Sequence, residues 1–138
     1  MIFNLVDGEL VRHERGYLGR SLGKDNAARH CSIGVYELAP GESGADYHFE
    51  LTREEWLVVV SGELTLRTPD GERVLRAGDT VAFVPGEAGA HQVRNDGDVP
   101  ARLAMPSTLE ESRSVVYPDT GKVAVVAPGF FKLLELGE

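Results

Sequence analysis

The sequence contains a single cysteine, Cys31, among its 138 residues. One cysteine excludes an intramolecular disulfide framework, and we interpret it as a small buried apolar residue. No apolar stretch is longer than that at residues 56–60, which is far shorter than the roughly 20 residues that a membrane-spanning helix needs. The N-terminus also lacks the basic segment and continuous apolar core of a secretory signal. Without such a signal we expect a cytoplasmic protein.

Basic residues are also scarce, since 14 Lys and Arg stand against 22 Asp and Glu, giving a formal net charge of -8. No basic run or arginine-rich helical segment occurs. Nucleic acids and anionic membranes bind clustered Lys and Arg, so neither is expected as a partner. A small molecule and a second copy of the chain are the partners that we predict.

Long helical patterns are missing, whereas 16 glycines and 7 prolines separate short apolar runs. These runs lie about 8–12 residues apart, which is typical of an all-β sandwich or barrel. We expect strands at 32–38, 55–60, 63–67, 72–75, 80–84, 92–94, 101–105, 114–117 and 123–126. The chain is long enough for one domain, 1–138, with a barrel core at about 32–126. The first thirty residues are expected to form an edge strand or an arm, and only 108–112 and 130–136 have a weakly helical pattern.

Four polar side chains in this framework form a candidate metal-ligand set: His48, Glu50, Glu55 and His91. Imidazole suits zinc, copper, iron and nickel, and carboxylate adds hard oxygen that suits manganese and iron. Because His48 and Glu50 are two residues apart, they point to the same face if they lie in a strand. The sequence therefore predicts a site for a divalent transition metal, namely Fe, Mn, Ni or Zn.

The spacing of these residues resembles the two motifs of the cupin family. The residues that carry the resemblance are Gly41, His48, Glu50, Glu55 and Gly62 in the first motif, and Gly78-Asp79, Pro85-Gly86, His91 and Asn95 in the second. It covers about residues 33–106. It implies a small conserved-barrel cupin, that is, an all-β double-stranded β-helix or jelly-roll barrel, with a short C-terminal extension and a metal inside. An open coordination position would then distinguish a catalytic site from a closed structural one.

Glu50 departs from the family pattern, which usually has a second histidine there. Either Glu50 is the fourth ligand, or it contacts a metal-bound water or the substrate. Glu54 competes with Glu55 as a ligand, but strand parity and the spacing to Gly62 favour Glu55. That parity directs Leu57 inward and Trp56 outward.

A cupin scaffold leaves the reaction open. A dioxygenase would use Fe(II) or Ni(II) at the four candidate ligands. A sugar or keto-acid isomerase would use the metal to polarise a carbonyl, with Glu50 as a candidate catalytic residue that moves the proton. A small-ligand sensor and a barrel with a purely structural metal are the non-catalytic alternatives.

The remaining polar residues are given structural interpretations. His13 and His30 are expected at the surface or hydrogen-bonded outside the site. Asp119 and Lys122 are either pocket groups or parts of a plain turn, and the turn is the simpler interpretation. Cupins commonly pair through an N-terminal strand, and the outward set Trp56, Val58 and Val60 would suit burial under such an arm. We therefore expect a homodimer.

Overall fold

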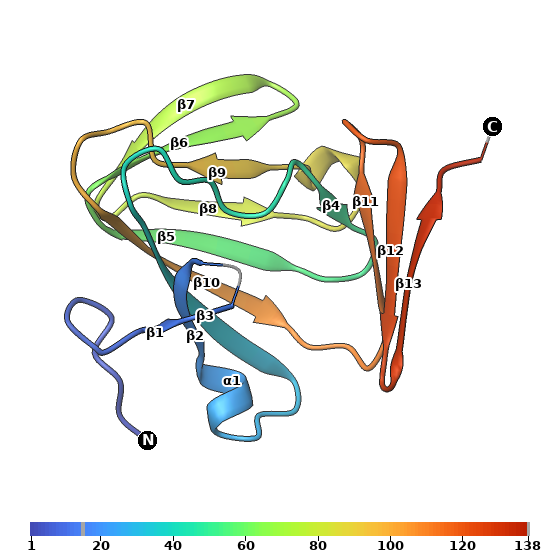
Figure 1. The fold of residues 1–138 in the computed structure, drawn as a ribbon, viewed down its shortest axis with the longest axis horizontal. Coiled ribbons are helices and arrows are strands. Elements are labelled where there is room, and N and C mark those ends of the chain that lie inside the picture. Colours follow the sequence, from blue (N-terminus) through green and yellow to red (C-terminus); the bar gives the residue numbers. More distant parts are fainter. Residues whose placement is uncertain (15, 138) are drawn as a thin grey trace.

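The computed structural model describes residues 1–14 and 16–137, which form mainly β-strands (Figure 1). The only helical elements among the described residues are α1 (Leu22–Asp25) and one 3-10 turn at Glu87–Gly89. The strands are β1 (Val11–Arg12), β2 (Leu18–Ser21), β3 (Cys31–Leu38), β4 (Phe49–Glu50), β5 (Glu55–Ser61), β6 (Glu63–Thr68), β7 (Gly71–Arg76), β8 (Thr80–Phe83), β9 (Gln92–Arg94), β10 (Ala101–Thr108), β11 (Arg113–Tyr117), β12 (Lys122–Ala127) and β13 (Phe130–Glu135).

The strands form three antiparallel sheets that enclose a common interior. A six-stranded sheet has the order β1-β2-β3-β10-β5-β8, a four-stranded sheet the order β13-β12-β11-β4, and a three-stranded sheet the order β7-β6-β9. Strand β10 lies between β3 and β5, far from both in sequence, so the chain crosses over as a jelly roll does. Figure 1 shows β11 to β13 standing together at one end of the other sheets. The predicted all-β jelly-roll fold is confirmed.

The core follows the predicted alternation along β5. Leu57 and Val59 are fully buried, whereas Trp56 between the glutamate and Leu57 is 50% exposed. Leu64 and Leu66 of β6 and Leu103 of β10 pack in the same cluster. Inward and outward side chains therefore alternate, and the side of β5 that carries Glu55 is the inner side.

The two chain ends differ from each other in how well they were predicted. Strands β1 and β2 extend the six-stranded sheet beside β3, as expected of an N-terminal edge. The helical interpretation of 130–136 is wrong, because Pro128-Gly129 turns the chain back and β13 pairs with β12 from Phe130 onward. Residues 108–112 are not helical either, since Thr108 ends β10 and Arg113 begins β11.

Two further expectations concern the surface. Cys31 is exposed at the start of β3, so its interpretation as a buried residue is wrong. No helix in residues 1–14 and 16–137 combines the length and the apolar character that membrane crossing requires. The cytoplasmic location stays a prediction.

The turn between β5 and β6 depends on Gly62, whose φ is +76°. A Cβ at this position would lie 2.8 Å from the Pro100 carbonyl oxygen and 2.9 Å from the Ala101 Cα. Both contacts are with backbone, which cannot move aside as a flexible side chain could. Gly121, with φ +66°, has no described atom within 4 Å of the corresponding position.

We expect Gly62→Ala to lower the free energy of unfolding by more than Gly121→Ala does. The Gly121 variant meets only the left-handed strain of a non-glycine residue, about 1–2 kcal/mol, and the Gly62 variant adds the backbone clash. Urea denaturation of both variants measures the difference. Equal losses of stability in the two variants would show that the contact of the new Cβ at position 62 with the backbone is relieved without cost.

The homodimer also stays a prediction. The N-terminal strands pair within their own chain, and Trp56 is half exposed. We expect light scattering to give twice the chain mass of 15.0 kDa, and Trp56→Glu to shift the mass to that of a monomer. Val74→Glu is the matched control, since Val74 is an exposed apolar residue on β7. A monomeric wild type would contradict the prediction.

Candidate metal centre

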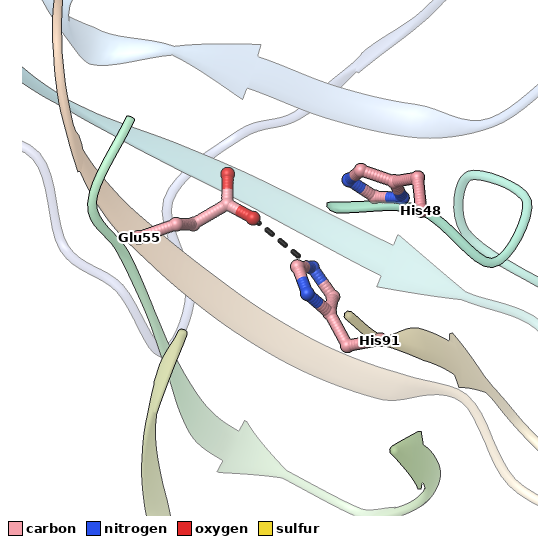
Figure 2. Close-up of side chains that lie close together, drawn as sticks. All are labelled: His48, Glu55 and His91. Atoms are coloured by element: carbon pink, nitrogen blue, oxygen red, sulfur yellow. Dashed lines mark ion pairs between the residues drawn. The ribbon is translucent and has the colours of Figure 1, made fainter. Parts of the chain in front are cut away.

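Three of the four predicted ligands converge inside the barrel. One ligand atom from each of His48, Glu55 and His91 lies within 4.8 Å of the others, and Figure 2 shows the three side chains pointing toward one another. We call these residues the His-Glu-His triad. Glu50 is not part of this group, although its side chain lines the same cavity.

Backbone pairing brings the two histidines together. His48 and His91 form an isolated antiparallel bridge, in which the His48 amide donates to the His91 carbonyl at 3.1 Å and the His91 amide donates back at 2.9 Å. Their ring centroids are 4.7 Å apart. Glu55 arrives from another sheet, as the first residue of β5. The triad is therefore held by three separate segments of the fold.

Backbone carbonyls hold both imidazoles by the same ring nitrogen. Nδ1 of His48 lies 2.7 Å from the Asp46 carbonyl oxygen, and Nδ1 of His91 lies 2.9 Å from that of Gly89. A carbonyl oxygen only accepts, so each Nδ1 is the protonated donor. In the neutral ring this leaves a lone pair on Nε2, the arrangement that histidine ligands of metals commonly have.

The contact between His91 and Glu55 is close but is not a hydrogen bond. Nε2 of His91 lies 3.1 Å from Oε1 of Glu55, the pair joined by the dashed line in Figure 2. His91 is 3% exposed, and its Nε2 is buried without a hydrogen-bond partner among the described residues. With Nδ1 donating elsewhere, two lone pairs face each other unless a proton or a cation lies between them. Two ligands bound at about 2.1 Å to one ion are roughly 3.0–3.4 Å apart, so the distance fits a shared cation.

The surroundings of the triad restrict both its motion and its charge. The Phe83 ring stacks on His91, with centroids 3.6 Å apart and an interplanar angle of 10°. Burial lowers the pKa of His48 below its usual range, and the neighbouring His91 lowers it further. A neutral His48 is the form that can bind a cation, so this environment favours the ligating state.

Glu50 forms an ion pair with an arginine that the sequence analysis did not single out. Nη1 of Arg113 donates to Oε1 of Glu50 at 2.8 Å, and Val115 of the same strand is the register partner of Glu50. Glu50 is only 6% exposed, and its second oxygen, Oε2, is buried without a hydrogen-bond partner among the described residues. Burial raises the pKa of the Glu50 carboxyl, and the Arg113 guanidinium opposes that rise.

A cavity of about 670 Å³ opens beside these groups. Its volume lies within the range of small-molecule sites. The whole triad lines it, together with Glu50, Arg53 and Arg113. The site thus combines a candidate metal position, a carboxylate and two guanidinium groups around a space that can hold a small polar molecule.

The other candidates lie outside the cavity lining. His30 is exposed, and Nε2 of His13 contacts the Gly19 carbonyl oxygen at 3.2 Å. Asp119 pairs with Arg67, and Lys122 lies 3.7 Å from Glu135, which fits the plain-turn interpretation. Glu54 is exposed and Glu55 belongs to the triad, as parity predicts. Ligation by Glu50 stays a prediction.

Arg113 and Arg53 are the site residues that sequence reasoning missed. Arg113 had a usable signal, because the alternation Arg113, Val115, Tyr117 places all three on one face of β11, and all three line the cavity. Arg53 had none, since it lies in the loop between β4 and β5, where side-chain direction has no period.

Solved structures with similar folds include two bacterial proteins that match over 88% of this chain and 77% of their own length. One is a candidate sugar phosphate isomerase from Acidithiobacillus ferrooxidans, at 27% identity and a TM-score of 0.81. The other is a cupin-superfamily sugar phosphate isomerase from Silicibacter pomeroyi, at 24% identity and a TM-score of 0.82. A predicted oxalate decarboxylase from Thermotoga maritima matches 80% of this chain and 100% of its own at 17% identity and a TM-score of 0.65. The last two are too distant in sequence to indicate more than the fold.

No curated protein matches the chain in sequence. Residues 34–106 match a protein family that is described as Cupin domain. This segment contains the whole triad and is more than half of the chain. With the jelly-roll topology, the two motifs and this match together, the chain belongs to the cupin family.

Proposed function

We propose that the protein is a metal-dependent isomerase of small polar hydroxy-carbonyl compounds. The observation that carries the proposal is the convergence of the triad on one point of the cavity, with two imidazole lone pairs and a carboxylate oxygen within 4.8 Å. Glu50 lines the same cavity, and its Oε2 has no hydrogen-bond partner among the described residues, which supports the catalytic part.

His48, Glu55 and His91 would hold the cation, and Fe, Mn, Ni and Zn all suit this donor set. The buried lone pair on His91 Nε2, which lacks a partner among the described residues, fits such a role. When bound, a divalent cation supplies Lewis-acid polarisation of a carbonyl oxygen. Three protein ligands leave positions for water and substrate.

Glu50 supplies the proton transfer in this proposal. Arg113 binds Oε1 and so fixes the carboxylate, while Oε2 has no competing donor among the described residues. Oε2 takes a proton from the hydroxyl-bearing carbon next to the carbonyl and returns it to the former carbonyl carbon. The hydroxyl proton passes to the former carbonyl oxygen, so the atoms balance and no redox partner is needed.

The isomerase reaction is favoured over dioxygenase chemistry by two observations. A relative at 27% identity and a TM-score of 0.81 is named as a candidate sugar phosphate isomerase. In addition, Glu50 stands where cupins usually have a second histidine, and a carboxylate paired through one oxygen is suited to carry a proton on the other.

Metal binding is expected to depend on the triad. Wild-type protein reconstituted with Fe, Mn, Ni or Zn should retain about one ion per chain, while His48→Gln and His91→Gln should lose most of it. Elemental analysis after desalting measures the ion, and His30→Gln is the control because His30 is exposed and outside the triad. Failure of every metal to bind the wild type would overturn the proposal.

Isomerase activity is expected to depend on Glu50. In D2O, the loaded protein should exchange the hydrogen beside the carbonyl of a hydroxy-aldehyde or hydroxy-ketone, as NMR detects. Glu50→Gln should slow this exchange by about 10²–10⁴, the usual contribution of a general base, because the amide cannot accept the proton.

Glu54→Gln is the matched control, since Glu54 is an exposed carboxylate next to Glu55 of the triad. If Glu50→Gln loses the metal as well as the exchange, Glu50 is a ligand. If wild-type protein binds metal but exchanges no hydrogen across a panel of such compounds, the site is not an isomerase.

A further inference from the structure

We propose that Arg53 and Arg113 form a subsite that binds an anionic group of the substrate, a carboxylate or a phosphate, next to the triad. The inference deepens the proposed function and rests on it for the identity of the substrate. The subsite itself is argued from the arginines, their partners and the charge of the cavity.

Arg113 uses only part of its guanidinium in the pair with Glu50. Nη1 donates to Oε1, and the residues described offer no hydrogen-bond acceptor to Nε or Nη2. The side chain is 32% exposed and lines the cavity. The remaining N–H groups are therefore available to a ligand in the cavity.

Arg53 is more enclosed and has more unused donors. Its Nε lies 3.3 Å from Oε2 of Glu110, whose other oxygen accepts from the Thr108 hydroxyl at 2.8 Å. Neither Nη1 nor Nη2 donates to any residue that the structure describes, although the side chain is only 15% exposed. Neither of these nitrogens is among the buried unpartnered atoms of the described residues, so they are open to water or to a ligand. The cavity is the space that Arg53 lines, so a ligand there can satisfy them.

The charge of the cavity also favours an anion once a cation is bound. Three glutamates, Glu42, Glu50 and Glu55, line it against the two arginines. A divalent cation on the triad changes this excess of one negative charge into an excess of one positive charge. The protein as a whole carries -8, so a positive cavity would contrast with its surroundings and attract anions inward.

The geometry of the donors selects the kind of anion. A guanidinium presents paired N–H groups in one plane, which match the two oxygens of a carboxylate or of a phosphate. Two such groups in one cavity can hold one end of a substrate while its carbonyl lies at the triad. The proposed substrate class is therefore a small hydroxy-carbonyl compound that carries a carboxylate or a phosphate.

The test measures anion binding apart from catalysis. Isothermal titration calorimetry at constant ionic strength uses inorganic phosphate in one arm and acetate in the other, on metal-free and nickel-loaded protein. We expect the wild type to bind at least one anion at millimolar concentration, more tightly in the loaded form. Arg53→Gln should weaken binding by about 10- to 100-fold, the usual effect of losing hydrogen bonds to a charged group. The anion that binds more tightly, phosphate or acetate, indicates whether the substrate carries a phosphate or a carboxylate.

Arg20→Gln is the matched control, because Arg20 also pairs through Nε with one carboxylate and its side chain is 32% exposed, but it does not line the cavity. Arg53→Lys keeps the charge and should retain part of the affinity, even if Arg53→Gln does not fold. Equal anion affinity in the wild type and both Arg53 variants overturns the subsite, as does a wild type that binds neither anion. Hydrogen exchange and metal content of the wild type are measured separately. A wild type that binds the anion but binds no metal, or exchanges no hydrogen, overturns the proposed function and leaves the subsite standing.

Discussion

The site depends on the backbone pairing between the segments that carry His48 and His91, which are joined by the two hydrogen bonds of these residues and by further bonds between 41–44 and 93–95. The two residues belong to different motifs, and each directly precedes a short strand, His48 before β4 and His91 before β9. Once the bridge forms, both rings face the same cavity, and Glu55 needs only the inward parity of β5 to complete the triad.

Glu50 and Arg113 form the second element of the site, and each limits the freedom of the other. The arginine neutralises a carboxylate that is 6% exposed, which would otherwise be costly to bury with a charge. The carboxylate in turn holds the guanidinium at the cavity wall by one nitrogen. Because β4 pairs with β11 at Glu50 and Val115, the ion pair is also where the C-terminal sheet joins the site.

Much of this could be predicted from sequence, because parity and turn residues act locally. The spacing of His48 and Glu50, the parity of Glu55 and the turn at Gly78 depend on neighbouring residues alone. The Glu50–Arg113 pair could not be predicted, since it requires knowing that β4 lies beside β11. The final strand was missed for a related reason: its apolar residues suit a helix as well as a strand, and only the Pro128-Gly129 turn and pairing with β12 decide.

The carbonyls of Asp46 and Gly89 influence which ion the protein binds. Because they orient both imidazoles in advance, little rearrangement is required when an ion enters. The affinities of nitrogen and oxygen donors for first-row ions generally follow the Irving–Williams series. Copper and zinc would outcompete manganese and iron at equal concentrations. The ion found in the purified protein would then be a record of the metal supply during expression.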